Sequence, residues 1–349
     1  MLETVTIAGM PPIIGVAISM SVEEAVRTAS VDLVPAGDRV PVSVGQEVVI
    51  KASGTTVLTG YVRDVSPSHE GEARALSVSL VSRTVDATEC SVLHKTGEVR
   101  GKSLADIARE YDGLGVGVED DGGLPVEPVH RLRVGESQFH TIERRARGRG
   151  ILIHDTPEGR LKLATKPAGT HSGGLRFGVN IRRASASFTE RGRHSKVHVR
   201  GQASEGIDAQ QLRGQAVATD SSVSRDRPLV LQHEGESTTD RMKKRAEWQA
   251  KRAAGNAATA EITVTGWRDS AGIIWTPNFL VYVEDDWIGI NGSMLIKAVT
   301  LSQTGDGEDG TTATLSLADP RGYGGENPRG SSSDAYAAPG KITATWEQE

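Results

Sequence analysis

Two histidines, His194 and His198, stand four residues apart, which is the spacing that binds zinc when both side chains lie on one face of a helix. The residues around them alternate between apolar and polar types, as in a strand. Residues four apart on a strand are separated by about 13 Å, too far to share one metal ion. No glutamate follows His194, and the sequence offers no third ligand. We therefore predict no metal site.

Three consecutive carboxylates, Glu284, Asp285 and Asp286, precede Trp287 and suggest the acid and base of a glycosidase. Consecutive residues of a strand or turn point in different directions, so a solvated turn explains them better. The lone Cys90 has no nucleophile motif around it and is predicted to be a half-buried apolar residue, and no G-x-S-x-G sequence occurs. We predict no catalytic residues and a protein that is not an enzyme.

A third candidate for chemistry is the glycine run Gly113, Gly115 and Gly117, which suggests a dinucleotide-binding loop. Such a loop must follow a strand and open a helix, so that the helix N-terminus holds the phosphates. Here the run follows a predicted helix, and no helix opens after it. We therefore predict no cofactor.

The composition narrows the class of protein. A formal charge of -5 gives no global attraction to nucleic acid or to membranes. Forty glycines with many valines and threonines favour a strand-rich fold with tight turns and large subunit contacts. One cysteine excludes an internal disulfide. No apolar run approaches the roughly 20 residues of a membrane-spanning helix and no secretion signal begins the chain, so we expect a soluble protein made in a reducing cytoplasm.

The pattern of one strand pair occurs twice in the sequence, at residues 59–80 and 296–317. In each copy, a strand with alternating apolar and polar residues precedes a tip rich in glycine and acidic residues, and a second strand of the same kind follows. This pattern predicts an antiparallel hairpin with one buried face. Two interpretations stay open at this point. The copies reflect an internal duplication, or they coincide because any β protein contains several hairpins.

Helical patterns interrupt the strands at three places. Ser103 and Asp106 form a capping pair, which predicts a short helix that ends near Gly113. The second helix is predicted at 137–147 and the third at 239–254, where Gly255 and Asn256 stop it. Six basic residues coat the third helix, and a solvated face explains them at least as well as a binding face.

The stretch 176–200 is the most basic strand region of the sequence. Two interpretations stay open, a solvated or subunit-facing surface and a contact to an acidic partner or a phosphate backbone. The basic residues are Arg176, Arg182, Arg183, Arg191, Arg193, Lys196 and Arg200.

The order and spacing of several short motifs resemble the baseplate hub family of contractile phage tails, which includes hubs of Mu-like phages and, more distantly, the late-control D proteins. No single motif is diagnostic, and the stretch after Pro320 matches nothing in the family. The residues that carry the resemblance are Gly60-Tyr61-Val62, Val81-Ser82-Arg83, Phe139, Ile142, Glu143, Ala146, Arg147, Gly150, Leu152, Gly159-Arg160-Leu161, residues 195–202, Gly266-Trp267-Arg268, Gly272, Trp275, residues 281–285, Gly289, Leu295-Ile296 and residues 315–320.

The resemblance implies a mainly β fold with α+β insertions, in which two similar small β-barrels and smaller α/β subdomains assemble into a trimeric ring. It implies a first, tube-facing barrel at 1–95, a small α/β part at 96–174, and a second barrel built from 175–202 and 272–320. An inserted α/β part would span 203–271 and contain the helix at 239–254, and 321–349 would be a flexible C-terminal tail. That tail ends in an alternating segment that could add to a partner's sheet edge.

For function, the resemblance implies a structural baseplate hub in the virion tail, assembled in the host cytoplasm. Its expected partners are two further copies in a homotrimer, the tail tube protein, the central spike protein and other baseplate proteins. DNA would pass through a central channel only in transit, and no stable membrane insertion is expected. The acidic hairpin tips at 69–72 and 305–310 become candidate contacts to the tail tube.

Three other functions remain as alternatives. The first is a tail-associated cell-wall hydrolase, against which the missing acid–base pair counts. The second is the hub of a phage-tail-like secretion or injection particle. The third is a nucleic-acid-binding protein that uses the basic strands and the third helix, whose binding would weaken steeply with salt.

Overall fold

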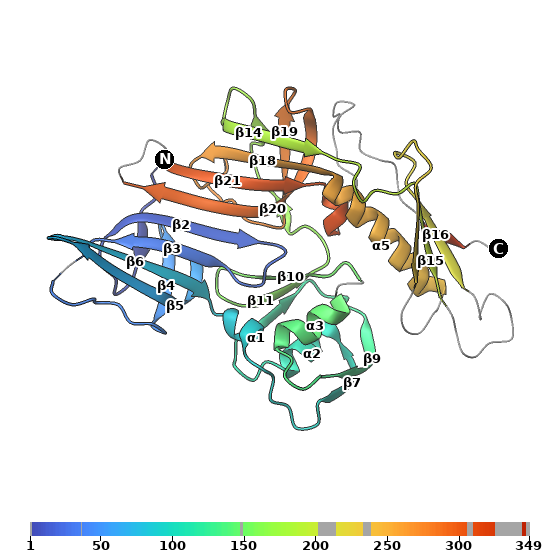
Figure 1. Ribbon diagram of the computed structural model, residues 1–349, viewed down its shortest axis with the longest axis horizontal. Helices are drawn as coiled ribbons and strands as arrows, with labels where there is room; N and C mark the ends of the chain where they lie inside the picture. Colours follow the sequence, from blue (N-terminus) through green and yellow to red (C-terminus); the bar gives the residue numbers. More distant parts are fainter. Residues whose placement is uncertain are drawn as a thin grey trace.

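One long, mostly antiparallel sheet dominates the computed structural model, which describes residues 2–35, 37–146, 149–201, 214–232, 239–305, 310–324 and 344–346. Its strands follow the order β1-β4-β5-β6-β3-β2-β20-β21-β18-β14, with β19 beside β20 and the short strands β12 and β13 beside β19. Figure 1 shows these strands on the left and upper side, with the remaining parts below and to the right. The mainly β fold class is therefore confirmed.

The first half of this sheet is continuous in sequence. Side chains alternate between buried and exposed along its strands, as in β3, where Ala29, Val31 and Leu33 are buried and the residues between them are exposed. The strands are β1 (Val5–Ile7), β2 (Ile13–Ser21), β3 (Thr28–Leu33), β4 (Glu47–Ala52), β5 (Thr55–Glu70) and β6 (Ala73–Ser82).

The second half repeats the strand order of the first. Neighbouring strands follow the order β2-β3-β6-β5-β4 in the first half and β14-β18-β21-β20-β19 in the second. Strands at the same place in the two orders also come in the same sequence along the chain, so β2 corresponds to β14 and β5 to β20. The strands of this half are β12 (Gly169–Thr170), β13 (Leu175–Arg176), β14 (Ile181–Phe188), β18 (Ala258–Thr265), β19 (Phe279–Asp285), β20 (Ile290–Thr304) and β21 (Thr311–Ala318).

The two halves also share their β-bulges. The first shared bulge lies in β2 and in its counterpart β14. Its extra residue is Ile14 in β2 and Arg182 in β14, in each case directly after the first residue pair of the ladder. Arg63 in β5 and Lys297 in β20 are the extra residues of the other. A bulge changes the twist and register of a strand at one defined position, so two shared bulges are not a coincidence of hairpins. They support an internal duplication.

The halves are not closed barrels. β2 pairs with β20 from Gly15 opposite Thr304 to Ser21 opposite Ala298, and this junction fuses the halves into one sheet with one apolar core. The pairings of the described residues run along an open path with β1 and β14 at its ends. The prediction of two separate barrels is corrected in this respect, because the outer edge of β2 bonds to the other half instead of closing its own.

A small α/β part follows the first half. Leu104, Ile142, Leu161 and Leu163 are fully buried between its helices and strands. As predicted, the Ser103 hydroxyl accepts a hydrogen bond from the Asp106 amide at 3.2 Å. The elements are α1 (Val85–Glu89), β7 (Glu98–Ser103), α2 (Leu104–Glu110), β8 (Val118–Asp120), β9 (Val126–Arg131), α3 (Gln138–Ala146), β10 (Leu152–Asp155) and β11 (Leu161–Ala164). The predicted end of the second helix, at 147 and 148, lies outside the described residues.

A separate four-stranded sheet packs against the long helix α5 (Thr239–Ala257) at the right of Figure 1. Its strands, in the order β17-β15-β16-β22, are β15 (Lys196–Arg200), β16 (Gln215–Thr219), β17 (Pro228–Gln232) and β22 (Ala344–Trp346). Val197, Val199, Met242 and Ala246 are buried between sheet and helix.

This sheet corrects three predicted assignments. The resemblance implies that the strand at 196–200 belongs to the second barrel, but this strand bonds to β16 and β17. It also implies that the strand at 258–265 belongs to the inserted part, but this strand lies between β14 and β21 of the main sheet. The C-terminal strand was expected to add to a partner's sheet edge, but it pairs with β16 of its own chain.

Helix α5 continues through the predicted stop at Gly255 and Asn256 and ends at Ala257. A Cβ atom at Gly255 would lie 2.6 Å from the Cα of Gly322, in the short helix η1 (Pro320–Tyr323). The glycine therefore permits a close approach of two backbones and does not end the helix. Tyr323 is also buried, so the predicted flexible tail does not begin at 321. Residues 325–343 and 347–349 lie outside the described residues.

Candidate assembly surfaces

Apart from the outer edges of its short strands β1, β12 and β13, the described part of the main sheet has two open edges on long strands. β14 pairs with β18 on one side only, and β5 pairs with β4 only as far as Tyr61, so that its distal part, 63–70, pairs with β6 alone. An open edge presents unpaired backbone N–H and C=O groups, which form a template for a further strand. Within the described part of the chain, no strand covers either edge.

Apolar side chains along these edges are only half buried. Val65 on β5 and Ala184 and Ala186 on β14 pack against the main core but remain partly accessible to solvent. At the β2–β20 junction, by contrast, Ile18 and Leu301 are completely buried. The open edges of β5 and β14 therefore resemble the β2–β20 junction, except that the neighbouring strand is missing at each of them.

The tip of the β5–β6 hairpin is an exposed acidic projection. Residues 69–72 are all exposed, Gly71 has a φ of +57°, and the hairpin reaches the left-hand end of the molecule in Figure 1. The positive φ explains the glycine at the turn. Of the second predicted tip, only the flanking Gly305 and Gly310 are described, and 306–309 lie outside the described residues.

Large apolar side chains are also exposed in loops of the second half. Phe177 is 70% exposed, Val179 78% and Trp287 92%. Large exposed apolar groups that gather in one region mark contact surfaces more often than isolated ones do. These residues follow β13 and β19, which are neighbours in the sheet.

The residues that could have formed a metal site do not do so. His194 lies in the loop before β15 and His198 lies within that strand. Among the residues that the structure describes, no group of three histidine, cysteine, aspartate or glutamate side chains could hold a metal ion. Cys90 is exposed, which corrects its predicted half burial, because it lies just beyond the end of α1.

The three carboxylates lie at the end of β19 and in the turn that follows it, but Asp285 is buried, which corrects the predicted solvated turn at that residue. Glu284 pairs with Arg176 at 3.0 Å, and Asp285 accepts hydrogen bonds from the amides of Trp287 and Ile288. Asp286 accepts from the side-chain amide of Asn291 at 2.6 Å. Each carboxylate thus has its own structural partner, and the three do not face a common substrate position.

The glycine run is a closed turn. The Asp112 carboxylate accepts hydrogen bonds from the amides of Val116 and Gly117, at 2.9 and 2.7 Å. These are the backbone donors that a phosphate would need. A carboxylate of the same chain already occupies them.

The basic strand region also pairs internally. Arg193 lies 2.7 Å from Asp220, and the Arg200 guanidinium donates to Gln215. On α5, the guanidinium of Arg245 lies 5.1 Å from the centre of the Trp248 ring, and Arg252 pairs with Glu23 in the segment between β2 and β3. Several of these positive charges therefore have partners within the chain.

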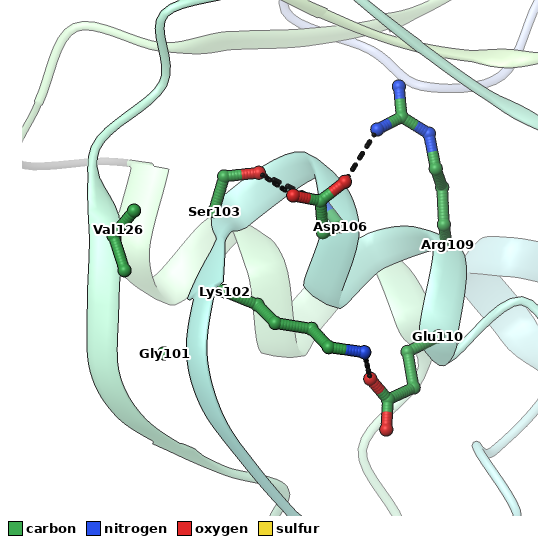
Figure 2. A pocket seen from close by; sticks show the side chains of 7 residues that line it. All are labelled: Gly101, Lys102, Ser103, Asp106, Arg109, Glu110 and Val126. Atoms are coloured by element: carbon green, nitrogen blue, oxygen red, sulfur yellow. Dashed lines mark hydrogen bonds and ion pairs between the residues drawn. The ribbon is translucent and has the colours of Figure 1, made fainter.

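An open recess lies between β7, α2 and β9 of the α/β part (Figure 2). Its charged side chains pair with one another: Lys102 contacts Glu110, and Asp106 accepts from Ser103 and from Arg109 at 2.6 and 2.9 Å. The recess is therefore neutralised by its own ion pairs. It offers no unpartnered group to a ligand.

The structure brings together one buried polar pair that the sequence did not reveal. His171 and Asp269 have fully buried side chains, and their Nδ1 and Oδ2 atoms lie 2.9 Å apart. Because Nε2 accepts a hydrogen bond from the Thr276 amide, Nδ1 carries the proton and donates it to Asp269. Both ring nitrogens are used and the ring lies against Trp275 and Phe279, so the pair is structural. The partners are 98 residues apart and carry no motif.

A second buried pair connects the first half to the α/β part. The Arg27 side chain and the Asp155 carboxylate are almost completely buried, with Nε and Oδ2 3.3 Å apart. The Arg27 amide donates to the same carboxylate and to the Ser82 hydroxyl. This pair fixes the position of β10 against the main sheet.

Two family models match separate parts of the chain. Residues 84–165 match the second domain of gp44-like baseplate hub proteins. Residues 238–326 match the fourth domain of the Mu phage baseplate assembly protein GpP. The baseplate hub protein gp44 of Escherichia phage Mu is 26% identical over 306 residues, which cover 84% of this chain and 80% of the phage protein.

Solved structures show the same fold. A 43 kDa tail protein of prophage MuSo2 from Shewanella oneidensis is 28% identical, with a TM-score of 0.79 over 92% of this chain and 99% of its own. A tail protein from Neisseria meningitidis MC58 is 19% identical, with a TM-score of 0.76 over 93% and 99% of the two chains. The Escherichia coli c3393 protein, a component of the type VI secretion system, is 11% identical with a TM-score of 0.58, over 90% of this chain and 76% of its own.

Proposed function

The chain belongs to the baseplate hub and tail protein family of Mu-like phages, and we propose that it is the trimeric adaptor that joins a sixfold tail tube to a threefold central spike. The relatives are structural tail proteins, so the chain is a structural component of the virion tail and not an enzyme. No helix of the described residues is long and apolar enough to cross a membrane.

The observation that carries this proposal is the repeated strand order of the main sheet. Three copies of a chain with two similar halves present six similar units in a ring, whereas each chain as a whole obeys threefold symmetry. Such a ring can contact a sixfold tube with its repeated halves. The remaining parts, which occur once in each chain, can contact a threefold partner.

In this proposal the repeated halves surround a channel through which DNA passes in transit. The exposed β5–β6 tips contact the tail tube protein, and the non-repeated parts contact the spike and other baseplate proteins. The trimer assembles in the host cytoplasm before it enters the virion. The open strand edges and the exposed apolar loops support a role in assembly.

A hub in a phage-tail-like secretion particle is the second candidate. The fold likeness to the type VI secretion component c3393 favours it, although that likeness concerns the fold alone. The identity to Mu and to the MuSo2 prophage protein favours a phage tail. Purification of virions from the source phage, followed by detection of the chain in the baseplate fraction, separates the two.

The test of the proposed function is nucleation of the tube. Purified hub is added to purified tail tube protein of the same phage, and polymerisation is followed by light scattering and electron microscopy. The hub should shorten the lag and remain at one end of each tube. A charge-reversed tip, Glu72→Lys, should lose this effect without loss of folding, and a matched change at Glu143 of α3 should not. Tubes that form at the same rate without end-bound hub would contradict the proposal.

A further inference from the structure

We propose that the open edge of β14 pairs with the open part of β5 in a neighbouring copy of this chain, antiparallel and in a register that the internal repeat defines. The inference deepens the proposed function and rests on it for closure of the ring at three chains. The strand pairing itself rests on the geometry of one chain.

The repeat supplies the argument. Within the chain, β2 of the first half pairs with β20 of the second half. The repeated strand order makes β14 the counterpart of β2, and β5 the counterpart of β20. The contact that β2 makes with β20 is therefore available a second time, between β14 of one copy and β5 of the next. Both of these edges are open in the described structure.

The paired residues fix the correspondence between strands. Ile18 in β2 lies opposite Ala29 of β3, and Ala186 in β14 lies opposite Ala260 of β18, within the segments Thr28-Ala29 and Thr259-Ala260 that match in sequence. The shared bulges at Ile14 and Arg182 agree with this alignment. Ala186 is thus the counterpart of Ile18.

The same procedure aligns β5 with β20. Their bulges superimpose Arg63 on Lys297, within the similar segments Val62-Arg63-Asp64-Val65 and Ile296-Lys297-Ala298-Val299. Pro67 then becomes the counterpart of Leu301. Because Ile18 lies opposite Leu301 within the chain, Ala186 should lie opposite Pro67 of the neighbouring copy.

This register brings complementary residues together. It places Arg183 opposite Glu70 of the neighbouring copy, two exposed side chains of opposite charge. It also places Phe188 opposite Val65, and both of these are half buried against the core. Opposite charges and apolar pairs across strands each stabilise a sheet by about 0.2–1 kcal/mol.

One pair provides a direct structural precedent. In the junction within the chain, the hydroxyl oxygens of Ser19 and Thr300 lie 3.4 Å apart. Their counterparts are Ser187 and Ser66, which are both exposed. The open edges thus also carry a hydroxyl side chain at each of the two positions that form the hydroxyl contact in the closed junction.

Pro67 limits the partners with which the open edge of β5 can pair. The proposed β14–β5 contact between copies is therefore possible without indiscriminate pairing of this edge. In the closed junction the Val22 amide donates to the Lys297 carbonyl, and the Gly305 amide donates to the Ile14 carbonyl. Alternate residues of β20, Leu301 among them, therefore face β2. Proline at the corresponding place of β5 has no N–H, so the contact between copies has one hydrogen bond fewer. A proline on an edge strand also disfavours indiscriminate pairing with other strands.

The contact is heterologous, because β14 of one copy meets β5 of the next. A heterologous contact forms a closed ring only when its rotation divides a full turn, and it forms a filament otherwise. If the rotation between the halves of one chain is repeated between chains, each contact adds the same angle. Six halves from three chains then complete the proposed ring.

Engineered cysteines test the pairing in the full chain. In a Cys90→Ser background, Ser66→Cys and Ser187→Cys are made separately and together. A disulfide needs Cβ atoms about 3.5–4.5 Å apart, which the Ser66–Ser187 pair should allow because its counterparts have touching hydroxyls. After mild oxidation, a mixture of the two single variants should shift on a non-reducing gel from one chain to two. The double variant should shift to three.

The matched control is Ser30→Cys, an exposed serine on β3, which already has strand partners on both sides. Mixed with Ser187→Cys, it should give no two-chain species. The mass of the uncrosslinked protein is measured in parallel by light scattering. A trimer whose 66–187 pair does not crosslink would overturn the edge pairing and leave the proposed function intact. A crosslinked ladder beyond three chains would support the pairing and contradict the proposed ring. A monomer without crosslinks would overturn the pairing.

Discussion

The two halves of the main sheet share a strand order and two bulges but differ in what lies at their edges. In the chain, the outer edge of β2 is covered by β20, whereas the corresponding edge of β14 is open. The same strand arrangement thus forms a contact within the folded chain at β2 and an exposed edge at β14. The covered edge carries large buried side chains such as Ile18, and the open edge carries smaller, half-buried ones such as Ala186.

The halves also differ in what is attached to them. The first half runs without interruption through β6, and it holds the α/β part through the buried pair of Arg27 and Asp155. The counterpart of Arg27 in the second half is Ala258, so this half has no such pair at that position. Its own addition, β15, β16, β17 and α5, is inserted between β14 and β18, and the C-terminal strand β22 completes the small sheet. Duplication therefore preserved the sheet while each half acquired a different addition.

The largest expected effect separates the closed junction from the open edge. Leu301→Asp places a charge in a completely buried position, which should lower the free energy of unfolding by about 4 kcal/mol or more. In the dissociated single chain, Pro67→Asp, at the corresponding exposed position of β5, should change it by less than about 1 kcal/mol. Urea denaturation followed by circular dichroism measures both variants. Equal effects would contradict the proposed equivalence of a buried and an open edge.

Loss of the buried ion pair should come next. Arg27→Met leaves Asp155 buried without its partner, which should lower the free energy of unfolding by about 3–5 kcal/mol. Arg27→Met combined with Asp155→Leu should recover part of that loss, because it removes both charges. Arg63→Met serves as the control, since its pair with Glu89 is exposed and should contribute less than about 1 kcal/mol. A double variant no more stable than Arg27→Met would show that the pair does not act as a unit.

Acidification should act on the α/β part through His130. Burial lowers the pKa of this histidine to about 4, and its Nε2 lies 2.9 Å from the Thr141 hydroxyl. The unfolded chain has a histidine pKa of about 6.5, so it binds more protons than the folded chain between pH 6.5 and 4. Stability should therefore fall as the pH is lowered through this window, by up to about 3 kcal/mol.

Thermal unfolding of His130→Gln between pH 7 and pH 4.5 measures this contribution. The variant should lose stability less steeply with acid than the parent chain does. His69→Gln, at the exposed hairpin tip, is the matched control and should leave the slope unchanged. An identical slope in His130→Gln and in the parent chain would assign the acid sensitivity to other groups.

The smallest of these effects concerns the addition to the second half. Gly255→Ala places a Cβ 2.6 Å from the Gly322 backbone, and overpacking of this kind destabilises by about 1–3 kcal/mol. Hydrogen exchange in α5 should accelerate, whereas exchange in the first half should not change. Asn256→Ala, at the exposed neighbouring position, should have no such effect. Faster exchange in both halves would show that α5 is part of one cooperative unit with the whole sheet.

The sequence predicted elements whose signals are local. Alternation predicted the two hairpins, and the capping pair of Ser103 and Asp106 predicted the start of α2. Features set by distant partners were missed. Gly255 reads as a stop because its neighbour Gly322 is remote in sequence, and strand 196–200 could not be assigned to its sheet without its pairings. The pair of His171 and Asp269 has no local signal at all.

The central claim is that two repeated halves in each chain build a ring of six from three copies. Light scattering on the purified chain, combined with electron microscopy of the same sample, measures this most directly. We expect a particle of three times the 37.0 kDa chain mass and ring-shaped images with a central opening and six similar outer units. A stable monomer at micromolar concentration, or a closed ring of a different number of chains, would contradict the account.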